Sequence, residues 1–305
     1  MQDKICLITG ANAGLGRATA LALARQGARV VMVCRDKARG EAARDEVRGR
    51  SGNREVELML CDLASLASIR SFVEQFSARY DRLHALVNNA GLALPERRTT
   101  VDGFEMVLGV NHLGHFALTL QLLEALRAGA PSRIVNVSSY KHGQYALDFD
   151  NLQLERGYSM LKSYAHSKLC NVLFTYELAR RLEGTGVTAN CVHPGAAATS
   201  INANSGAVFL LPAVAMLMAV RSLGFLTPEE GAVTQVWAAS APELEGVSGK
   251  YFGGIWRKCQ EERSSKSSYD VETARKLWEY SERVTGVSMS PSAMERVKVS
   301  TGEPR

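Results

Sequence analysis

Short apolar runs alternate with amphipathic stretches along most of the chain. Most of these runs are too apolar to be half-exposed, so they predict strands that are buried on both faces of a sheet. The stretches between them place apolar residues at helical spacing, as in residues 15–26, 37–48 and 66–80. Strand and helix in alternation predict an α/β fold, a doubly wound parallel sheet with helices on both faces. The predicted strands are residues 4–9, 29–34, 56–61, 84–88, 133–138 and 187–192.

One domain is expected to comprise residues 1–288, because no linker rich in proline, glycine or serine and no internal repeat divides the chain. Residues 289–305 are polar and without pattern, which indicates a flexible C-terminal tail. An insertion at about residues 202–226 contains the uncharged stretch GAVFLLPAVAMLMAV, residues 206–220. This stretch is shorter than the roughly twenty residues that span a bilayer. We expect it to be a lid over an apolar substrate; a core or subunit interface and an interfacial membrane contact are the alternatives.

Composition narrows the possible partners and location. The chain has 305 residues, 46% of them hydrophobic, which is enough for a well-buried core. Its net charge of +5 is spread thinly and is not interleaved with aromatic residues, so nucleic acid is not expected as a partner. The six cysteines are scattered without any Cys-x-x-Cys spacing, as is typical of reduced thiols. Since the apolar run at residues 5–8 is also too short for a signal peptide, we expect a cytoplasmic protein.

A glycine-rich segment, TGANAGLGR, follows the first predicted strand and opens the first predicted helix. Gly10, Gly14 and Gly16 permit a tight turn and let the backbone approach a ligand closely. The free amide groups and the dipole at the start of a helix favour a pyrophosphate there. The segment therefore predicts a dinucleotide-binding turn, and a glycine-rich turn without a ligand is the alternative.

The end of the second predicted strand indicates which dinucleotide binds. A carboxylate is expected about twenty residues after the glycines if the ribose 2′-hydroxyl is recognised. Here that position is occupied by Cys34, and Arg35 follows it. A guanidinium can pair with a 2′-phosphate, so NADP(H) is favoured over NAD(H). The alternative is that Arg35 pairs only with Asp36 or with solvent.

The spacing Tyr-x-x-x-Lys occurs twice, as Tyr158 with Lys162 and as Tyr164 with Lys168. Residues four apart share one helix face, so either lysine could lie near its tyrosine. Six residues at about 100° each place the two tyrosines about 120° apart, so both cannot face one cleft. Tyr164 is favoured, because small residues flank it and a continuous apolar helix follows it. Tyr158 is expected at the frayed helix entrance.

Together these elements resemble the short-chain dehydrogenase/reductase family, from residue 4 to about residue 286. The resemblance is strongest to its retinol dehydrogenase-like branch, through VCRDKARGEAA, VNHLGHF, TPEEGA and an insertion that contains residues 149–152. It implies a Rossmann fold and hydride transfer at a nicotinamide. The matching motifs are Thr9-Gly-x-x-x-Gly-x-Gly16, Cys61-Asp62-Leu63, Asn88-Asn-Ala-Gly91, Asn111, Ser138-Ser139, Tyr164-x-x-x-Lys168 and His193-Pro194-Gly195.

The resemblance implies a role for each matched residue. Tyr164 would be the general acid/base and Ser139 would donate a hydrogen bond to the reacting oxygen. Lys168 would lower the tyrosine pKa together with an oxidised nicotinamide, and would hold the nicotinamide ribose. The backbone of Asn111 would hold a water that connects Lys168 to solvent. The implied cofactor-binding residues are Gly10, Asn12, Ala13, Gly14, Leu15, Gly16, Arg35, Asp62, Leu63, Asn88, Ala90, Gly91, Tyr164, Lys168, Pro194, Gly195 and Thr199.

Two departures from the commonest family pattern affect the expected site. Ser139 and Tyr164 are separated by an inserted loop, residues 140–161, which we expect to form a wall of the substrate site. Residues 196–198 are three alanines before Thr199, with no bulky or charged side chain. His112 and His115 are three residues apart, but no cysteine or carboxylate nearby would complete a metal site, so no metal is expected.

We therefore predict an NADP(H)-dependent carbonyl reductase, or the reverse alcohol dehydrogenase, that acts on a small apolar carbonyl or alcohol of the retinal or retinol kind. A nucleotide-binding regulatory or scaffold protein of the same fold, without turnover, is the alternative. The presence of Ser139, Tyr164, Lys168 and Asn111 together favours the enzyme, because a sensor needs only the glycine-rich half. The resemblance implies a homodimer or homotetramer, with contacts through the helix that contains Tyr164.

Overall fold

An eight-stranded sheet forms the centre of the molecule in a computed structural model that describes residues 1–195, 226–255 and 258–289. Its strand order is β3-β2-β1-β4-β5-β6-β7-β8. All neighbouring strands are parallel except β8, which is antiparallel to β7. The strands are β1 Ile5–Thr9, β2 Arg29–Cys34, β3 Val56–Leu60, β4 Ala85–Asn88, β5 Ser132–Val137, β6 Val187–Val192, β7 Tyr251–Ile255 and β8 Lys258–Glu261.

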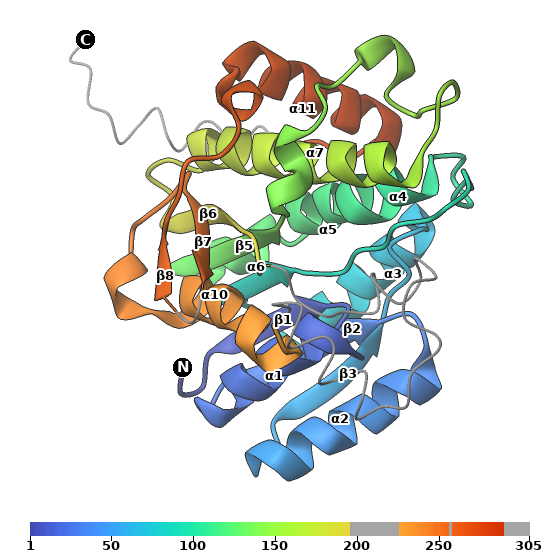
Figure 1. The fold of residues 1–305 in the computed structure, drawn as a ribbon. Helices are drawn as coiled ribbons and strands as arrows, with labels where there is room; N and C mark the ends of the chain where they lie inside the picture. Colours follow the sequence, from blue (N-terminus) through green and yellow to red (C-terminus); the bar gives the residue numbers. More distant parts are fainter. Residues whose placement is uncertain (196–225, 256–257, 290–305) are drawn as a thin grey trace, which may run out of the picture.

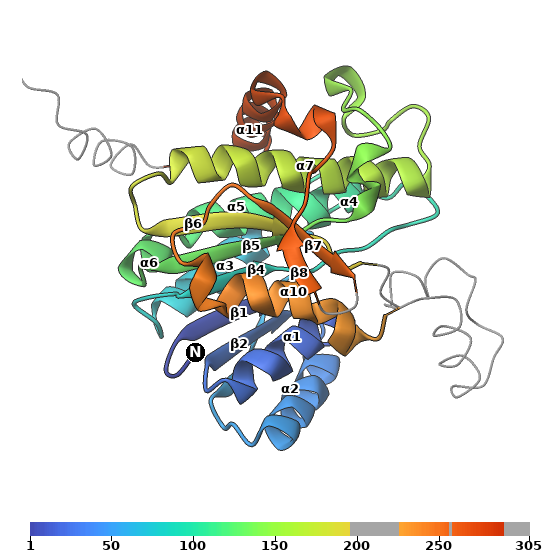
Figure 2. The same cartoon turned by 60° about the vertical axis from the view of Figure 1, so that its left-hand side comes forward.

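Helices cover both faces of the sheet (Figure 1). One face is covered by α1 (Gly14–Arg25), α2 (Lys37–Ser51) and α10 (Pro228–Ser240), with α1 packed between the other two. The opposite face is covered by α3 (Leu66–Ser77), α4 (Met106–Leu108), α5 (Gly114–Gln121), α6 (Leu123–Ala128) and α7 (Met160–Arg181). The C-terminal helix α11 (Val271–Thr285) lies outside α7, as Figure 2 shows from a second direction.

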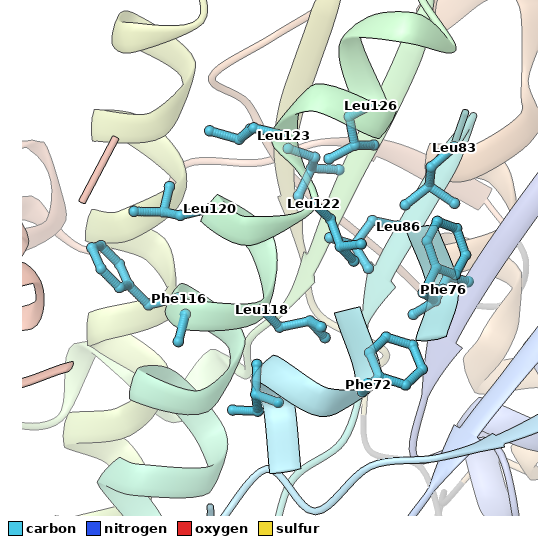
Figure 3. Close-up of a cluster of buried hydrophobic side chains, with 14 of the residues drawn as sticks. Phe72, Phe76, Leu83, Leu86, Phe116, Leu118, Leu120, Leu122, Leu123 and Leu126 are labelled. Carbon is cyan, nitrogen blue, oxygen red and sulfur yellow. The ribbon is translucent and has the colours of Figure 1, made fainter. Parts of the chain in front are cut away.

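Each face of the sheet has its own apolar core, because neighbouring side chains of a strand point to opposite faces. Leu7 and Val31 pack toward α3, α5 and α7, whereas Ile8 and Val30 pack toward α1, α2 and α10. Phe72 and Phe76 of α3 belong to the larger cluster, and leucines of the α5–α6 region lie to one side of them in Figure 3. Rigid packing on both faces fixes the strand ends where loops and side chains form a site.

The sequence predicted the first six strands to within about one residue at each end, and the fold class is confirmed. Strands β7 and β8 were not predicted. Two glycines, Gly253 and Gly254, weaken the strand signal of β7, and β8 is a short polar segment at the sheet edge. The loop of residues 140–161 contains two short 3₁₀ turns, Tyr140–Gly143 and Phe149–Asn151. The proposed lid, Thr199 and residues 290–305 lie outside the described residues.

Candidate active site

A cavity of about 520 Å³ lies at the carboxyl ends of the parallel strands. The ends of β1, β2, β3, β4, β5 and β6 all contribute to its lining, which is where an open α/β sheet binds its ligands. The cavity extends from Arg35 and Asp62 on one side to Lys168 and Gly195 on the other. Two groups of predicted residues, from the glycine-rich turn and from the Tyr164 segment, therefore share one cavity.

The glycine-rich turn lines this cavity, and its glycines allow the close turn between β1 and α1. Gly10 and Gly14 have φ angles of +66° and +51°, which glycine adopts without strain. A side chain on Gly16 would approach the Gly10 carbonyl oxygen to 2.4 Å, so only glycine lets α1 begin this close to β1. The N-cap of α1, Ala13, makes no capping side-chain hydrogen bond. The amides of the first turn are therefore left for an anionic ligand.

Thr9 and Asn89 tie the glycine-rich turn to the loop after β4. The Thr9 hydroxyl accepts hydrogen bonds from the backbone N–H groups of Asn89 and Ala90, at 2.9 and 3.0 Å. The side-chain amide of Asn89 donates to the Thr9 carbonyl at 2.8 Å. Asn89 lines the cavity and was missed by the sequence reasoning, although it is the second residue of the Asn-Asn-Ala-Gly motif. These bonds fix the two loops relative to each other.

Arg35 and Arg39 provide positive charge at the β2 side of the cavity. Both are exposed and line the cavity, and neither forms an ion pair with another described residue. The carboxylate of Asp36 accepts the backbone N–H of Arg39 at 2.9 Å and thereby caps α2. The alternative of an Arg35–Asp36 ion pair is therefore not what the structure contains. Arg39 was not predicted, since it lies one helical turn beyond the strand end where the motif search stopped.

Tyr164, Ser139 and Lys168 meet at the β5–β6 side of the cavity, which all three line. Ser139 follows β5, and both Tyr164 and Lys168 belong to α7. Lys168 is 2% exposed, and its ammonium lies 5.6 Å from the centre of the Tyr164 ring and donates to the Val137 carbonyl at 2.9 Å. Ser138, by contrast, directs its hydroxyl to the Lys168 carbonyl at 2.8 Å and so supports α7. Ser139 is therefore the serine available to a substrate.

Burial shifts the pKa values of both Tyr164 and Lys168. Removal from water raises the pKa of the Tyr164 phenol to about 12, although its interaction with the Ser139 hydroxyl acts in the opposite direction. Burial also lowers the pKa of the Lys168 ammonium to about 8. The expected fall of the tyrosine pKa is thus not a property of the protein alone, because desolvation of the phenolate outweighs the nearby groups. In this environment Tyr164 is a protonated hydrogen-bond donor at neutral pH.

The second Tyr-x-x-x-Lys pair does not face the cavity. Helix α7 begins at Met160 with Ser159 as its N-cap, so Tyr158 precedes the helix. The Tyr158 hydroxyl donates to the Leu94 carbonyl at 2.8 Å. The predicted separation of about 120° between the two tyrosines is wrong, because it assumed that one helix contains both. For the same reason, Tyr158 and Lys162 do not share a helix face. Of the two tyrosines, only Tyr164 lines the cavity.

Asn111 lies in a π-helical segment, Gly109–Leu113. Its side chain accepts from the Leu92 N–H at 2.9 Å and donates to the Leu92 carbonyl at 3.0 Å and the Ser167 hydroxyl at 3.0 Å. Its backbone carbonyl contacts Nδ1 of His115 at 3.1 Å. π-Helical turns often occur at functional sites, and this one brings Asn111 beside Lys168 and Gly91.

Most predicted cofactor residues line the cavity, and of those that the structure describes Asn88 does not. Asn88 is 2% exposed and donates its side-chain amide to Thr119 and Asn136, both at 2.8 Å, inside the core. Thr199 lies outside the described residues. The predicted residues that line the cavity are Gly10, Asn12, Ala13, Gly14, Leu15, Gly16, Arg35, Asp62, Leu63, Ala90, Gly91, Ser139, Tyr164, Lys168, Pro194 and Gly195.

His112 and His115 make separate hydrogen bonds. His112 contacts the Ser281 hydroxyl of α11 at 3.0 Å, whereas His115 contacts the Thr9 hydroxyl at 2.9 Å. Among the residues that the structure describes, no three histidine, cysteine or acidic side chains lie close enough together to hold a metal ion. In the same part of the chain, no helix has both the length and the apolar character to cross a membrane.

Comparison with known proteins identifies a family and several relatives. The sequence model of the short chain dehydrogenases matches residues 4–207. Human retinol dehydrogenase 14 is 47% identical over 302 residues, which cover 94% of this chain and 88% of that protein. Human retinol dehydrogenase 13 is 44% identical over 294 residues, which cover 96% of this chain and 87% of that protein.

Solved structures show the same fold. An uncharacterised protein from Mycobacterium paratuberculosis superposes with a TM-score of 0.76 at 33% identity, over 95% of this chain and 96% of its own. A variant of actinorhodin polyketide ketoreductase with NADPH superposes with a TM-score of 0.64 at 26% identity, over 84% of this chain and 98% of its own.

Proposed function

We propose, from the premise that the chain belongs to the short-chain dehydrogenase family, that it is an NADP(H)-dependent oxidoreductase with Tyr164 as its general acid/base. Its substrate would be a lipophilic aldehyde or ketone, or the corresponding alcohol, of the retinal or retinol kind. The family and the retinol dehydrogenase relatives establish an oxidoreductase that acts on CH–OH groups. Our proposal adds the dinucleotide, the residue roles and the substrate class.

One observation carries the proposal: Ser139, Tyr164 and Lys168 line the same cavity as the glycine-rich turn. A nicotinamide dinucleotide has two ends, and this cavity offers chemistry suited to each. The uncapped amides of α1 and the two exposed arginines suit its phosphates. Ser139, Tyr164 and Lys168 line the other end of the cavity, where the nicotinamide would bind. When bound, the dinucleotide supplies or accepts the hydride.

The side chains of the protein handle the proton. In reduction, the Tyr164 hydroxyl donates its proton to the carbonyl oxygen, and its raised pKa keeps that proton in place until it is needed. The Ser139 hydroxyl donates a hydrogen bond to the same oxygen as negative charge develops on it. The Lys168 ammonium stabilises the tyrosinate that remains, at a distance of 5.6 Å from the ring centre. Oxidation of an alcohol follows the reverse order.

The mouth of the cavity favours an apolar substrate. Tyr140, Met160 and Leu161 line it, and 54% of Tyr140 and 42% of Leu161 are exposed. Exposed apolar side chains around a polar reaction centre are typical of sites that bind hydrophobic ligands. This lining supports the proposal that the loop of residues 140–161 forms a wall of the substrate site.

The cysteines and the packing of α11 bear on the location and the oligomeric state of the protein. The six cysteines are free and five of them are buried, which supports a reducing, cytoplasmic location. Burial raises the pKa of the Cys61 and Cys191 thiols to about 12, so these thiols are not reactive nucleophiles. A homodimer or homotetramer stays a prediction; because α11 packs on α7, a subunit contact through that side would include α11.

The test is NADPH oxidation against a series of aldehydes, with Tyr164→Phe and Tyr158→Phe measured in parallel. Loss of the acid/base hydroxyl should reduce kcat by about a hundredfold or more in Tyr164→Phe, the range for a general acid. Tyr158→Phe removes the bond to the Leu94 carbonyl and the one from the Ser163 hydroxyl, and it should retain most activity because Tyr158 does not line the cavity. Equal losses would refute the assignment, and a kcat/KM that does not rise with carbonyl chain length would refute the lipophilic substrate.

The alternative function, a regulatory or scaffold protein, predicts the opposite result for NADPH oxidation. A regulatory protein of this fold would bind NADPH in calorimetry and oxidise none of it with any carbonyl. Binding with no turnover would therefore support the alternative, whereas no binding of either reduced dinucleotide would exclude both readings.

A further inference from the structure

Two buried histidines, His142 and His193, both pack against the ring of Tyr251 and do not line the cavity. His142 belongs to the turn after Ser139, and His193 follows β6 and precedes Pro194. Their ring centres lie 5.0 and 5.5 Å from that of Tyr251, which is 3% exposed. Each histidine has one nitrogen on the backbone of a predicted site residue and the other on the segment of residues 258–265.

His142 connects Ser139 to Ser265. Its Nε2 accepts the backbone N–H of Ser265 at 2.9 Å, and its Nδ1 lies 2.7 Å from the Ser139 carbonyl. Because a backbone N–H can only donate and a carbonyl can only accept, the ring has its proton on Nδ1. Burial lowers the pKa of His142, which keeps the ring neutral and this arrangement intact.

His193 connects Gly195 to Glu262 with the opposite tautomer. Its Nδ1 accepts the backbone N–H of Gly195 at 3.3 Å, and its Nε2 lies 2.9 Å from the Glu262 carboxylate. The ring proton is therefore on Nε2. Gly195 has a φ angle of +68° and lines the cavity at the end where the nicotinamide would bind. The His193–Glu262 pair thus holds this turn in place.

His193 and Glu262 meet in the space that a side chain on Gly253 of β7 would occupy. A side chain at Gly253 would lie 2.0 Å from Nε2 of His193 and 2.6 Å from the Glu262 carboxylate. Gly253 has no positive φ angle that would require glycine for the backbone. Its lack of a side chain is therefore explained by the pair rather than by strand geometry.

We propose that His142 and His193 are positioning residues. Through them, residues 258–265 hold the backbone in place on both sides of the reaction centre. We call the connection through His142 the Ser139 brace and the connection through His193 the Gly195 brace. His142 fixes the backbone of Ser139, which would bind the substrate oxygen, and His193 fixes the Pro194–Gly195 turn, which would bind the nicotinamide. The inference rests on the proposed function for the roles of Ser139 and Gly195. The two braces act on different ligands, so their loss should have different kinetic effects.

The Ser139 brace is tested with His142→Phe, which keeps an aromatic ring beside Tyr251 and removes both nitrogens. We expect kcat to fall on the order of tenfold to a hundredfold, the cost of misplacing a reacting group, while the Kd for NADPH changes by less than about twofold. His142→Asn retains a donor near the Nδ1 position and should recover part of kcat. His84→Phe is the matched control. His84 also accepts a backbone N–H, that of Ile5 at 3.0 Å, but it lies at the opposite end of the sheet.

The Gly195 brace is tested with Glu262→Leu and Gly253→Ala. Both should raise the Kd for NADPH by about tenfold, the effect of losing one well-placed interaction. Glu262→Gln keeps an oxygen acceptor for Nε2 and should stay close to wild type. Glu261→Leu is the control, because Glu261 is the neighbouring residue but pairs with Lys250 at 3.0 Å instead.

Nitrogen NMR of the histidine rings gives a readout that does not depend on turnover. We expect a proton on Nδ1 of His142 and on Nε2 of His193 at neutral pH, and loss of the His193 signal pattern in Glu262→Leu. The inference is overturned if the tautomers are reversed, or if His142→Phe and His84→Phe lower thermal stability alike without any change in kcat. A wild-type protein that binds NADPH but reduces no carbonyl would refute the proposed function, while the tautomers and the Kd changes would still decide the bracing of Gly195.

Discussion

At the residue scale, the Thr9 hydroxyl shows how one atom can join segments that the sequence keeps far apart. It accepts from Asn89 and Ala90 and contacts Nε2 of His115 at 2.9 Å. Since the Nδ1 proton of His115 points to the Asn111 carbonyl, Nε2 is the acceptor and Thr9 donates to it. The hydrogen-bonded chain connects the glycine-rich turn to the π-helical segment beside Lys168. From the sequence spacing, His115 could be considered only as a possible metal ligand. Its hydrogen-bond partners come from distant parts of the chain and become known only with the fold.

Replacing His115 should therefore affect the cofactor site. His115→Leu leaves the Thr9 hydroxyl and the Asn111 carbonyl without this partner, which should cost about 1–3 kcal/mol of stability and raise the Kd for NADPH severalfold. His112→Leu removes a bond to Ser281 of α11 and should lower stability to a similar extent without changing that Kd. Calorimetry with NADPH and urea unfolding of both variants provide the measurements. Equal Kd values in the two variants would contradict the prediction.

The choice of dinucleotide should depend on Arg35 and Arg39. A guanidinium–phosphate hydrogen bond contributes about 1.5–3 kcal/mol, so Arg35→Ala should weaken NADPH binding by about tenfold or more and leave NADH binding almost unchanged. Arg39→Ala should act in the same direction. Arg44→Ala is the control on the same helix, because Arg44 pairs with Asp45 at 2.9 Å and does not line the cavity. Equal weakening of NADPH and NADH would show that neither arginine reads a 2′-phosphate.

At the element scale, helix boundaries explain what the sequence could and could not settle. The choice of Tyr164 over Tyr158 followed from its small neighbours and its apolar helix, and only Tyr164 lines the cavity. The start of α7 could not be placed, since Ser159 becomes the N-cap only once the inserted loop turns there. The apolar strands β1 to β6 have a strong signal, whereas β7 and β8 depend on pairing with β6 and with each other. Asn88 was assigned to the cofactor by motif, but a motif does not show which of two adjacent asparagines points inward.

Two glycines of α2 provide a matched test of element packing. A side chain at Gly49 would meet no atom within 4 Å, whereas one at Gly40 would approach Cys34 to 2.6 Å and Leu58 to 2.8 Å. Gly49→Ala should raise the free energy of unfolding by about 0.5–1 kcal/mol, because alanine favours the helix. Gly40→Ala should lower it by about 1–3 kcal/mol through overpacking. Urea unfolding would measure both changes, and a stabilised Gly40→Ala would contradict the close packing of α2 on β2 and β3.

At the scale of the whole molecule, burial determines how the protein responds to acid. Five of the six histidines have pKa values lowered mainly by burial: His84, His112, His115, His142 and His166. The folded state binds their protons less readily than the unfolded chain. The two-sided core that holds the site together therefore also makes the folded state sensitive to protonation.

The sign follows from His112 and His115, whose pKa values fall from 6.5 to about 3 and about 4. Between these values and about 6.5 the unfolded chain binds more protons, so the free energy of unfolding falls as pH is lowered through this window. Each histidine contributes a slope of up to about 1.4 kcal/mol per pH unit, and neither contributes a slope above pH 7. Urea unfolding at pH 7.5, 6.0 and 5.0 should show a steep loss in wild type and a shallower one in His112→Asn/His115→Asn. Because the variant will also be less stable at every pH, the slope is the quantity to compare; parallel curves would mean that carboxylates, rather than these buried rings, cause the acid sensitivity.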